Sequence, residues 1–574
     1  MKKLLYSVAV SLVMLTACES FLDSENLTKK DTSNFPSTEV DAVQMITGIY
    51  STLNNALIVP DDNPFYTYEM AGDDRFGGGS TSNRNAQSAD RLLNCKVSAF
   101  ESIWKIRYSG IFRANNAIST IDNVKKWDTN KKREQLLGEA HFLRAFFYFD
   151  MVQMFGEVPL VLEITPQNLP KSSADEIYAQ IAYDLVKAIE YFPAVAYPNF
   201  ELGRATKWSA EALMARVFLF YTGFYGKNEL PVANGGKAVT KADVIAYVED
   251  CVNNSGHSLL DDQRNLWPYT NPYTAPFYSY TKDKSLEWAG DNNQEVLFAI
   301  NFSNTTEFSA AGHEYSSGYA NRIVEYFGLR KSGESSFPFV PQGYSNGPVN
   351  SKLWNDWAND PDYTGDYRRE GSICDRAVEL PDYAGDPAKE VENTGLHAKK
   401  YLGCAAYDES GTLYQSYAYF YGGQNDKQLG LTQSLILIRF ADVLLMHSEL
   451  TETATGLNRV RQRANLPEVG YSLSALKKER RYELCFEALR WNDLRRWGDV
   501  ADIVANQTGV SLLNRGNEDK YTFGQYDFLN RYNATKGFWK IPDSQITLSE
   551  GVLEQNEGWD EASSDWTKLP YPTL

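Results

Sequence analysis

Carboxylates are the side chains of this sequence that could perform chemistry on a bound molecule. The chain contains 74 aspartates and glutamates but only 5 histidines, with no HExxH motif or other close histidine pair. A zinc site built on histidine is therefore unsupported. Hydrolysis of a glycosidic bond needs two carboxyl groups about 5 to 9.5 Å apart. Asp74 and Asp366 are acids that folding could bring together in this way, so a surface glycoside hydrolase stays open as an alternative.

A second pair of acids lies on one predicted helix. Asp442 and Glu449 are separated by about 10 Å along a helix axis, at roughly 1.5 Å per residue, which is marginal for a glycosidase. Their neighbours are Leu, Ile, Val and Met. We interpret both acids as members of a buried ion-pair network that ties helices together, with Arg439, Arg495 or Arg496 as the opposite charge.

Other motifs for enzymes and cofactors are incomplete. Residues 77–79 are three glycines without the Gly-Lys-Ser/Thr of a phosphate-binding loop, and no G-x-S-x-G is present. Asp360, Asp362, Gly365 and Asp366 form part of a calcium-loop pattern that lacks its third acid and its distal glutamate. We therefore predict no catalytic residues, no metal and no cofactor, and a structural calcium ion is unsupported.

Aromatic residues among Asp, Asn and Arg are the stronger candidates for binding a ligand. An aromatic ring can cover the C–H face of a sugar, while polar side chains satisfy its hydroxyls. Packing within the loops and contact with a partner protein are the alternatives. Four loops combine these features, and their candidate contacts are Asp73, Asp74, Arg75, Trp267, Tyr269, Trp288, Tyr315, Tyr319, Trp354 and Arg368.

Helical periodicity flanks these loops on both sides. Apolar residues recur at three- and four-residue steps, which predicts helices over 135–155, 172–192, 208–221, 435–450, 455–465 and 474–497. Ser172 or Ser173 with Glu176 is typical of a capping box. Segments 140–156 and 212–226 share a rhythm of alanine, arginine and aromatic residues. This rhythm indicates tetratricopeptide-like helix pairs, although no regular 34-residue period is present.

The middle of the chain, residues 226–430, has a different character. Gly, Asn, Pro, Ser and Tyr dominate it, helical periodicity fades, and one strand is predicted over 295–302. The region is too long for a plain linker, and such loops are usually functional. We predict a mainly α fold with a single domain over 39–574, in which 226–430 is a large excursion of loops and short strands.

The N-terminus has the features of a secreted lipoprotein. Met1-Lys2-Lys3 precedes an apolar stretch over 4–15 that is too short to span a bilayer. Leu15-Thr16-Ala17-Cys18 resembles a bacterial lipobox, which implies cleavage before Cys18 and acylation of that cysteine. We predict a signal peptide over 1–17 and a lipid-anchored tether over 18–38.

The net charge and the cysteine content bear on two further questions, namely whether the protein binds nucleic acid and whether disulfides stabilise it. The net charge of −18 becomes −20 when Lys2 and Lys3 are removed, which argues against a nucleic-acid partner. No CxxC motif is present, and the number of cysteines after Cys18 is odd. Disulfides are therefore expected to contribute little, and Cys485 is expected to be a buried thiol.

Several motifs then resemble one known family, SusD/RagB. Arg439–Glu449 resembles its R-x-A-D-V-L-L-M-x-x-E helix, and Leu457–Pro467 resembles its N-x-V-R-x-R-A-x-L-P turn. Glu479–Gly498 is similar to its ERR-x-E-L and RW-x-DL-x-RWG segments. Gly138–Ala145 and Trp539–Pro542 provide two further matches in family order.

The resemblance implies a surface lipoprotein of the outer membrane of a Bacteroidetes-type bacterium. Such proteins bind glycans and cap a SusC-like TonB-dependent transporter, and their irregular middle region forms the ligand face of a mostly helical fold. We expect a non-enzymatic protein that captures an oligosaccharide or polysaccharide for import. A two-carboxylate hydrolase, a peptide-binding RagB-type uptake protein and a purely structural lid remain alternatives.

Overall fold

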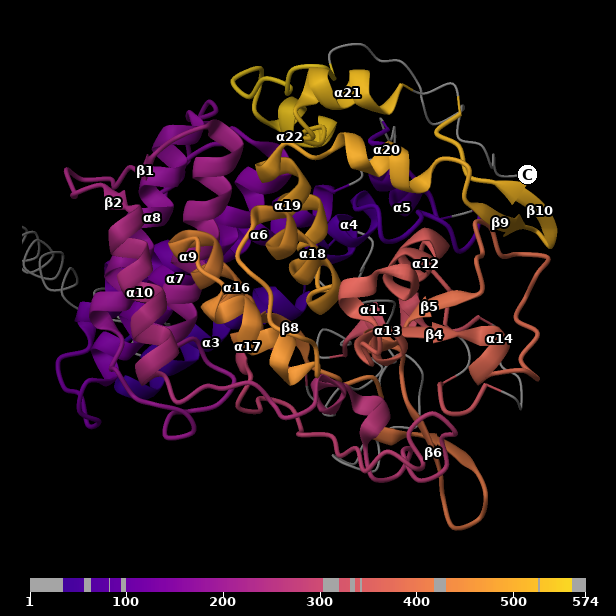
Figure 1. Cartoon of the computed structure of the whole chain (residues 1–574). Helices are drawn as coiled ribbons and strands as arrows, with labels where there is room; N and C mark the ends of the chain where they lie inside the picture. Colours follow the sequence, from indigo (N-terminus) through magenta and orange to yellow (C-terminus); the bar gives the residue numbers. More distant parts are fainter. Residues whose placement is uncertain are drawn as a thin grey trace, which may run out of the picture.

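The computed structural model describes residues 35–55, 63–81, 83–93, 100–302, 320–330, 336–340, 343–417, 430–524 and 527–559. The predicted signal peptide, Cys18, Tyr315 and Tyr319 lie outside these residues. Helices dominate, as predicted, and the strands are few and short (Figure 1). Among the described residues, none of the helices combines the length and the apolar character that a bilayer crossing needs.

Long helices pack side by side in the order of the sequence and form a scaffold. α7 contacts α6 and α8, α9 contacts α8 and α10, and α3 contacts α6. In Figure 1 these helices fill the left half of the view. Their bounds are α3 (Glu39–Asn55), α6 (Glu101–Thr120), α7 (Lys132–Phe155), α8 (Ala174–Tyr191), α9 (Lys207–Tyr225) and α10 (Lys241–Asn254).

Local sequence explains how these helices begin and why they pair. Ser173 accepts a hydrogen bond from the backbone of Glu176, whose side chain accepts in return, so the predicted capping box is confirmed at Ser173. Arg144 and Arg216 occupy equivalent places in the shared rhythm of α7 and α9. Arg144 pairs with an aspartate of α8 at 2.6 Å, and Arg216 pairs with an aspartate of α16 at 2.6 Å.

The C-terminal helices pack against the scaffold and complete it. α16 contacts α10, α17 and α18, while α19 contacts α9 and α4. The C-terminal helices are α16 (Phe440–Thr451), α17 (Thr455–Arg463), α18 (Leu473–Glu483), α19 (Arg490–Trp497), α20 (Ala501–Gln507), α21 (Phe528–Thr535) and α22 (Asp543–Leu548). Two short helices from the N-terminal part of the chain, α4 (Pro64–Ala71) and α5 (Arg84–Arg91), pack against each other.

The predicted strand at 295–302 is confirmed, and its partner is a surprise. β3 (Val296–Ile300) pairs antiparallel with β8 (Leu435–Arg439). The predicted helix over 435–450 is therefore wrong in its first five residues, and α16 begins only at Phe440. A short, continuous apolar run fits a buried strand as well as a buried helix. Pairing with a distant strand decided the outcome.

The predicted helix over 474–497 is also interrupted. α18 ends at Glu483 and α19 begins at Arg490. Between them, Phe486 and Ala488 have φ values of 65° and 59°, in the left-handed region that a helix does not use. Cys485 is a buried free thiol, as expected, but it lies in this break rather than in a helix.

The excursion consists of short elements, apart from α10. It contains η3 (Gln263–Leu266), η4 (Pro268–Thr270), α11 (Arg322–Phe327), α12 (Ser351–Asn359), η5 (Pro361–Tyr363), α13 (Arg368–Ser372), α14 (Arg376–Glu379) and η6 (Lys399–Tyr401). Its two-stranded sheets pair β1 (Glu229–Leu230) with β2 (Val239–Thr240), β4 (Ile373–Asp375) with β5 (Leu396–Ala398), and β6 (Ala405–Tyr407) with β7 (Leu413–Gln415). After the scaffold helices, β9 (Ser511–Asn514) pairs with β10 (Asn517–Lys520), and η2 (Ile121–Asn123) follows α6.

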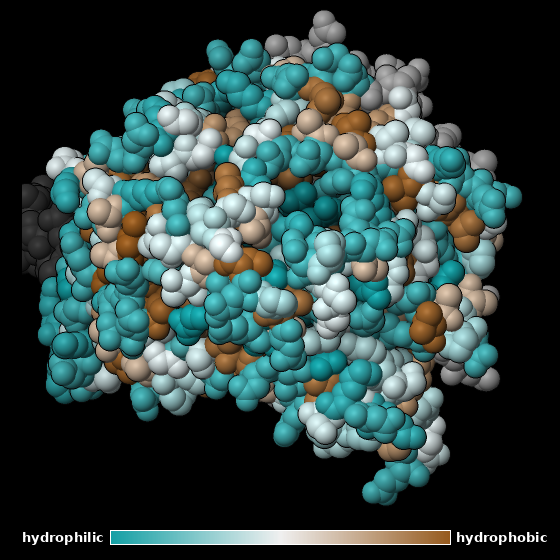
Figure 2. All heavy atoms as spheres, in the orientation of Figure 1, coloured by the Kyte–Doolittle hydropathy of each residue, from teal (hydrophilic) through white to brown (hydrophobic). Residues whose placement is uncertain are grey.

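One large apolar core runs through the scaffold and into the excursion, and a second, smaller core lies under α12. In the second core, Trp357 stacks on Tyr482 of α18 with ring centroids 4.4 Å apart. The face shown in Figure 2 is mostly hydrophilic, with apolar side chains scattered over it. The excursion is therefore attached to the C-terminal helices through its own packed interior.

Candidate ligand-binding face

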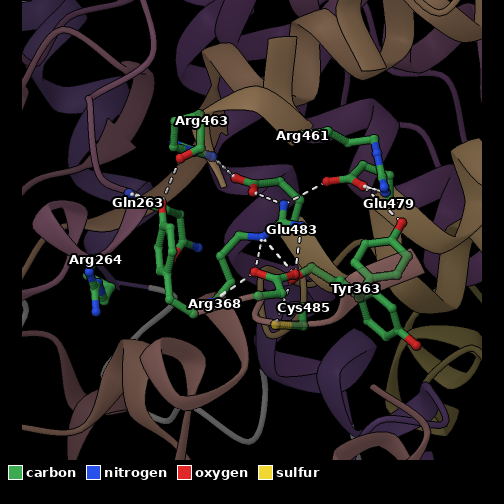
Figure 3. Close-up of polar contacts among 12 residues, drawn as sticks. Gln263, Arg264, Tyr363, Arg368, Arg461, Arg463, Glu479, Glu483 and Cys485 are labelled. Carbon is green, nitrogen blue, oxygen red and sulfur yellow. Dashed lines mark hydrogen bonds and ion pairs between the residues drawn. The ribbon is translucent and has the colours of Figure 1, made fainter. Parts of the chain in front are cut away.

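A buried cluster of arginines and glutamates holds the excursion on α18 (Figure 3). Arg368 Nη1 lies 2.6 Å from Glu479 Oε1 and 2.8 Å from Glu483 Oε2. Tyr363 donates its hydroxyl to Glu479 Oε2 at 2.9 Å. All four side chains are buried. These contacts fix the segment from η5 to α13 against α18.

Glu483 stays ionised although it is buried. Burial alone would raise the pKa of Glu483, but the guanidinium groups of Arg463, Arg439 and Arg368 outweigh it and hold the pKa well below its ordinary value. Removing one partner from such a cluster leaves an uncompensated charge in the interior. The cluster therefore has a structural role, and its atoms have no exposed surface for a ligand.

The interpretation of Asp442 and Glu449 as structural acids is confirmed. Asp442 lies 2.6 Å from Arg216 and 2.8 Å from Arg480, and Glu449 lies 2.5 Å from Arg496. Of the three arginines considered from the sequence, only Arg496 pairs with either acid in the described part of the chain. The guanidinium groups hold the pKa of Asp442 far below its ordinary value, against the opposing effect of burial.

The first candidate loop is buried rather than open to a ligand. Asp73 pairs with Arg490 at 2.7 Å, and Asp74 pairs with Arg481 at 2.7 Å. Arg75 is 1% exposed and pairs with a glutamate of α4 at 2.6 Å. The expectation that these three residues contact a ligand is therefore corrected, because Asp73 and Asp74 fasten the loop to α18 and α19 and Arg75 is paired within the loop's own surroundings. The partners of the two aspartates are distant in sequence, so no local signal could have identified them.

Three further candidates are also buried. Trp267 is 1% exposed and Tyr269 and Arg368 are 0% exposed. Tyr269 donates its hydroxyl to the carbonyl of Gly371 at 2.7 Å, and Trp267 meets the ring of Tyr401 edge-on at 5.7 Å. These residues shape the interior of the excursion, so the expectation that they contact a ligand directly is corrected as well.

Trp288 and Trp354 are the described candidates that keep part of their surface open. The guanidinium of Arg369 lies over the ring of Trp354 at 4.2 Å. Trp288 meets the ring of Tyr417 at 5.7 Å with an interplanar angle of 62°. The ring face of Trp354 is thus shared with a cation, whereas Trp288 packs at an angle against another aromatic ring.

A small hollow of about 10 Å³ lies beside Trp288. Trp267, Asp291, Gln433 and Ser434 are among the residues that line it. The backbone N–H of Ser434 donates to Asp291 Oδ1 at 3.3 Å. Trp267 Nε1 and Gln433 Oε1 are buried and have no hydrogen-bond partner among the described residues. The interior beside the ring of Trp288 therefore holds one donor and one acceptor that no described residue satisfies.

Segment 431–434 connects this hollow to a pair of tyrosines that the sequence reasoning missed. Asn321, which caps α11, donates its backbone N–H to the carbonyl of Leu431 at 2.7 Å and its amide to that of Gln433 at 2.9 Å. On the same helix, Tyr326 meets Tyr344 edge-on at 5.1 Å, and both rings are half-buried. Proximity in sequence to the third candidate loop was the only signal for Tyr326.

We define the aromatic–amide face as Trp288, Asp291, Tyr326, Tyr344 and segment 431–434. The stretch that carries Tyr315 and Tyr319 lies between the described residues Phe302 and Ala320. Both of its ends adjoin segment 431–434, since Ser434 donates to Asn301 Oδ1 at 2.9 Å and Asn321 bonds to Leu431 and Gln433. The two tyrosines themselves lie outside the described residues.

Comparison with known proteins identifies the family. A family model described as "Starch-binding associating with outer membrane" matches residues 20–219, and the model of the SusD family matches residues 353–559. The chain belongs to the SusD/RagB family. A SusD-like protein of Formosa agariphila is 24% identical over 518 residues, covering 85% of this chain and 88% of that protein. One from Bacteroides ovatus is 23% identical over 459 residues, covering 74% and 72%.

Solved structures share the SusD-like fold. A laminarin-binding SusD-like protein superimposes with a TM-score of 0.67 at 23% identity, covering 91% of this chain and 100% of that one. Surface glycan-binding protein A from Bacteroides thetaiotaomicron, in complex with laminarihexaose, gives a TM-score of 0.67 at 18% identity with the same coverage. The expected fold, with its helical scaffold and irregular middle, is confirmed.

Family membership also answers the question of catalysis. SusD-family glycan-binding proteins are non-catalytic. In this SusD-like chain, the two acids of the hydrolase alternative are each buried and paired, Asp74 with Arg481 and Asp366 with Arg368 at 2.8 Å. The hydrolase alternative is therefore wrong, because neither carboxylate is available to attack or protonate a substrate.

Proposed function

We propose that this SusD-like protein is a lipid-anchored, cell-surface protein of the outer membrane that captures oligosaccharides and delivers them to a SusC-like TonB-dependent transporter. The observation that carries the proposal is the aromatic–amide face. It combines the half-buried rings of Trp288, Tyr326 and Tyr344 with the carboxylate of Asp291 and the polar side chains of segment 431–434. Sugars need this combination of apolar stacking and directed hydrogen bonds.

The first ligand to test is laminarin. Solved relatives include a laminarin-binding protein and a protein in complex with laminarihexaose. We propose the same class, glucose polymers, for this chain and place the sugar over Trp288 with its hydroxyls toward Asp291 and Ser434. A negatively charged glycan would need cations at the face, and Arg322 on α11 is 9% exposed and already paired with Glu325 at 3.0 Å.

Isothermal titration calorimetry against laminarin, starch and a panel of other polysaccharides tests the binding. The change Trp288→Ala is expected to weaken binding roughly three- to tenfold, the usual contribution of one aromatic contact. Tyr407→Ala is the matched control, since Tyr407 is a 45% exposed ring on β6 outside the face. Equal losses for both variants, or tight binding of peptides and of no glycan, would overturn the proposal.

Anchoring and delivery need separate measurements. Cys18→Ser is expected to move the protein from the membrane fraction to the soluble fraction, because the acylated residue is lost. Affinity purification of the lipidated protein from detergent extracts is expected to recover the transporter. Recovery of the transporter together with full uptake by a variant that has lost glycan binding would favour the structural-lid alternative.

A further inference from the structure

An internal cavity of about 80 Å³ lies where the scaffold helices meet the C-terminal helices. Residues of α4, α6, α7, α9, β8, α16, α18 and α19 line it. A single water molecule needs roughly 10 to 15 Å³ of such a volume, so the cavity has room for several particles of that size. Its wall is largely apolar and includes Phe65, Phe146, Phe149, Leu213, Phe220 and Leu435.

Two arginines in this wall have N–H groups without a hydrogen-bond partner among the described residues. Arg107 on α6 is 3% exposed, and its Nε donates to Asp150 at 2.8 Å while its Nη1 has no partner. Arg216 on α9 donates its Nη2 to Asp442 and to the carbonyl of Leu437, while its Nε has no partner. Burial raises the pKa of Asp150 and both guanidinium groups oppose that rise, so both lie near the same carboxylate. Buried donors of this kind are costly unless a bound species accepts from them.

The buried charges around the cavity do not balance. Four arginines of the wall face four acids, the arginines being Arg107, Arg216, Arg480 and Arg496 and the acids Asp150, Asp442, Glu449 and Asp493. Glu487 also lines the cavity, but it belongs to a balanced cluster of five cations and five acids, namely Arg368, Lys400, Arg439, Arg461 and Arg463 with Glu295, Asp366, Glu479, Glu483 and Glu487. Arg495 is 2% exposed and forms no ion pair with a described residue. One positive charge therefore remains in excess.

Arg495 lies next to the wall of the cavity. Its Nη1 donates to the carbonyl of Gln153 at 2.8 Å, and its guanidinium lies 5.4 Å from the centroid of the Phe220 ring. Gln153 and Phe220 both line the cavity. The rings of Phe224 and Phe538, each 4.7 Å away, complete a neutral environment. A buried charge without a counter-ion is costly, and an anion in the adjacent cavity would offset it.

We propose that this cavity binds one small monovalent anion of the size of a halide ion, which accepts hydrogen bonds from Arg107 Nη1 and Arg216 Nε. Such an anion satisfies both donors and neutralises the excess charge, whereas water would satisfy only the donors. The bound anion links α6 to α9 inside the scaffold. The inference concerns the interior of the scaffold and does not depend on glycan capture.

Anomalous diffraction locates the anion directly. Crystals of the full chain carrying Cys18→Ser are grown in sodium bromide, so that the ion is present while the protein is handled and crystallised. An anomalous peak inside the cavity, within hydrogen-bond distance of Arg107 and Arg216, is the expected result. Water without an anomalous signal in the cavity would overturn the proposal.

Thermal unfolding tests whether the anion binds in solution. Sodium bromide replaces sodium gluconate, whose anion is far larger, at constant ionic strength. A specific site makes the unfolding midpoint rise and then saturate with bromide concentration. A general salt effect on the hydrophobic interior does not saturate and is the same in all variants. A midpoint that changes without saturation would mean binding at crystal concentration only, and the proposal would be wrong.

A matched pair of arginine variants identifies the site. Arg107→Lys keeps the positive charge beside Asp150 but removes the Nη1 donor, and it is expected to raise the half-saturating bromide concentration at least roughly tenfold, the usual contribution of a hydrogen bond to a charged group. Arg144→Lys is the control, since Arg144 is a buried arginine that pairs with Asp184 and does not line the cavity. Equal changes in both variants would contradict the assignment.

A cavity-filling variant keeps the test decisive if Arg107→Lys does not fold. Leu213→Phe narrows the cavity and leaves every charge in place. It is expected to lose both the anomalous peak and the saturable rise of the unfolding midpoint. Calorimetry with laminarin on this variant reports on glycan capture separately, and unchanged laminarin binding is expected. A saturable bromide effect that persists in a filled cavity would refute the proposal.

Discussion

The scaffold and the excursion are stabilised in different ways. α7 in the scaffold has 24 residues and α8 has 18, whereas α11 and α13 in the excursion have 6 and 5. Isolated helices shorter than about 12 to 15 residues are marginal in water. The scaffold helices can therefore form from local sequence and then pair, while the excursion needs contacts from elsewhere in the chain.

Those contacts are mainly buried charges supplied by the C-terminal segment. In the scaffold, Arg144 forms an ion pair with one carboxylate, that of Asp184. At the junction with the excursion, Arg439 pairs with three carboxylates, that of Glu295 in the excursion and those of Glu483 and Glu487 in the C-terminal segment. A binding face built on short elements thus obtains its rigidity from ionic anchors placed beneath it, and those anchors are the residues that look most like an active site in the sequence.

The largest effect is expected at Arg439. Its guanidinium lies 2.9 Å from Glu295, 2.5 Å from Glu483 and 2.7 Å from Glu487. Arg439→Gln leaves these buried acids short of positive charge, and we expect a loss of about 3 to 5 kcal/mol in the free energy of unfolding. Urea denaturation followed by circular dichroism measures it.

Arg144→Gln is the scaffold counterpart of that change. Asp184 keeps a contact of 2.7 Å to His141 after the arginine is lost, so we expect a smaller cost than at Arg439. Arg369→Gln is the surface control, because this arginine lies over Trp354 with 22% of its side chain exposed. The contrast between the two regions would be refuted if Arg144→Gln proved as costly as Arg439→Gln.

The second prediction concerns pH and uses one buried acid from each region. Burial raises the pKa of Glu392, in the excursion, to about 7, against the effect of Arg91. The folded state therefore binds this proton more tightly than the unfolded state, whose carboxyl has its ordinary value of 4.5. Its contribution to stability is complete below about pH 4.5 and is lost as the pH rises to 7.

Asp184 in the scaffold has the opposite sign. Burial would raise its pKa, but Arg144 and His141 outweigh burial and lower it from 3.8 to about 2. Its contribution is present above pH 3.8 and is lost as the pH falls toward 2. Glu392→Gln should remove the loss of stability between pH 4.5 and about 7, and Asp184→Asn should remove the loss between pH 3.8 and about 2. Each change is expected to amount to about 2 to 3 kcal/mol in the free energy of unfolding. Urea denaturation at pH values from about 2 to 8 measures both effects, and a change in the same pH range for both variants would contradict the assignment.

In both regions the sequence predicts local features better than it predicts contacts between distant segments. The capping box at Ser173, the helices over 132–155 and 174–191 and the strand at 296–300 follow from periodicity and local hydrogen bonds. The interruption at 484–489 does not, because Glu487 is drawn toward Arg439 and Lys400, which lie far away in sequence.

The same limit explains the errors at the site. The pattern Asp73-Asp74-Arg75 beside aromatic residues fits a sugar site, but its partners Arg481 and Arg490 are more than 400 residues away and bury it. A local pattern identifies residues that can make charged hydrogen bonds. It does not tell whether the partner of those hydrogen bonds is a ligand or another part of the protein. The half-buried rings of Trp288 and Tyr326 became distinguishable from the buried Trp267 and Tyr269 only once the tertiary contacts were known.

The smallest effect is expected at the helix caps. Removing a cap tests how far the helices of a region depend on hydrogen bonds between residues close in sequence. Ser173→Ala in α8 and Thr240→Ala in α10 each remove a capping box. α10 lies within residues 226–430 but packs on α9 and α16, so by its contacts it belongs to the scaffold. Both changes are expected to cost about 1 kcal/mol in the free energy of unfolding. Asn350→Ala, which removes the cap of α12 and also two hydrogen bonds to the carbonyls of Asp73 and Asn506, is expected to cost more. If all three changes cost the same free energy of unfolding, the excursion depends on distant contacts no more than the scaffold does, and the contrast between the two regions is wrong.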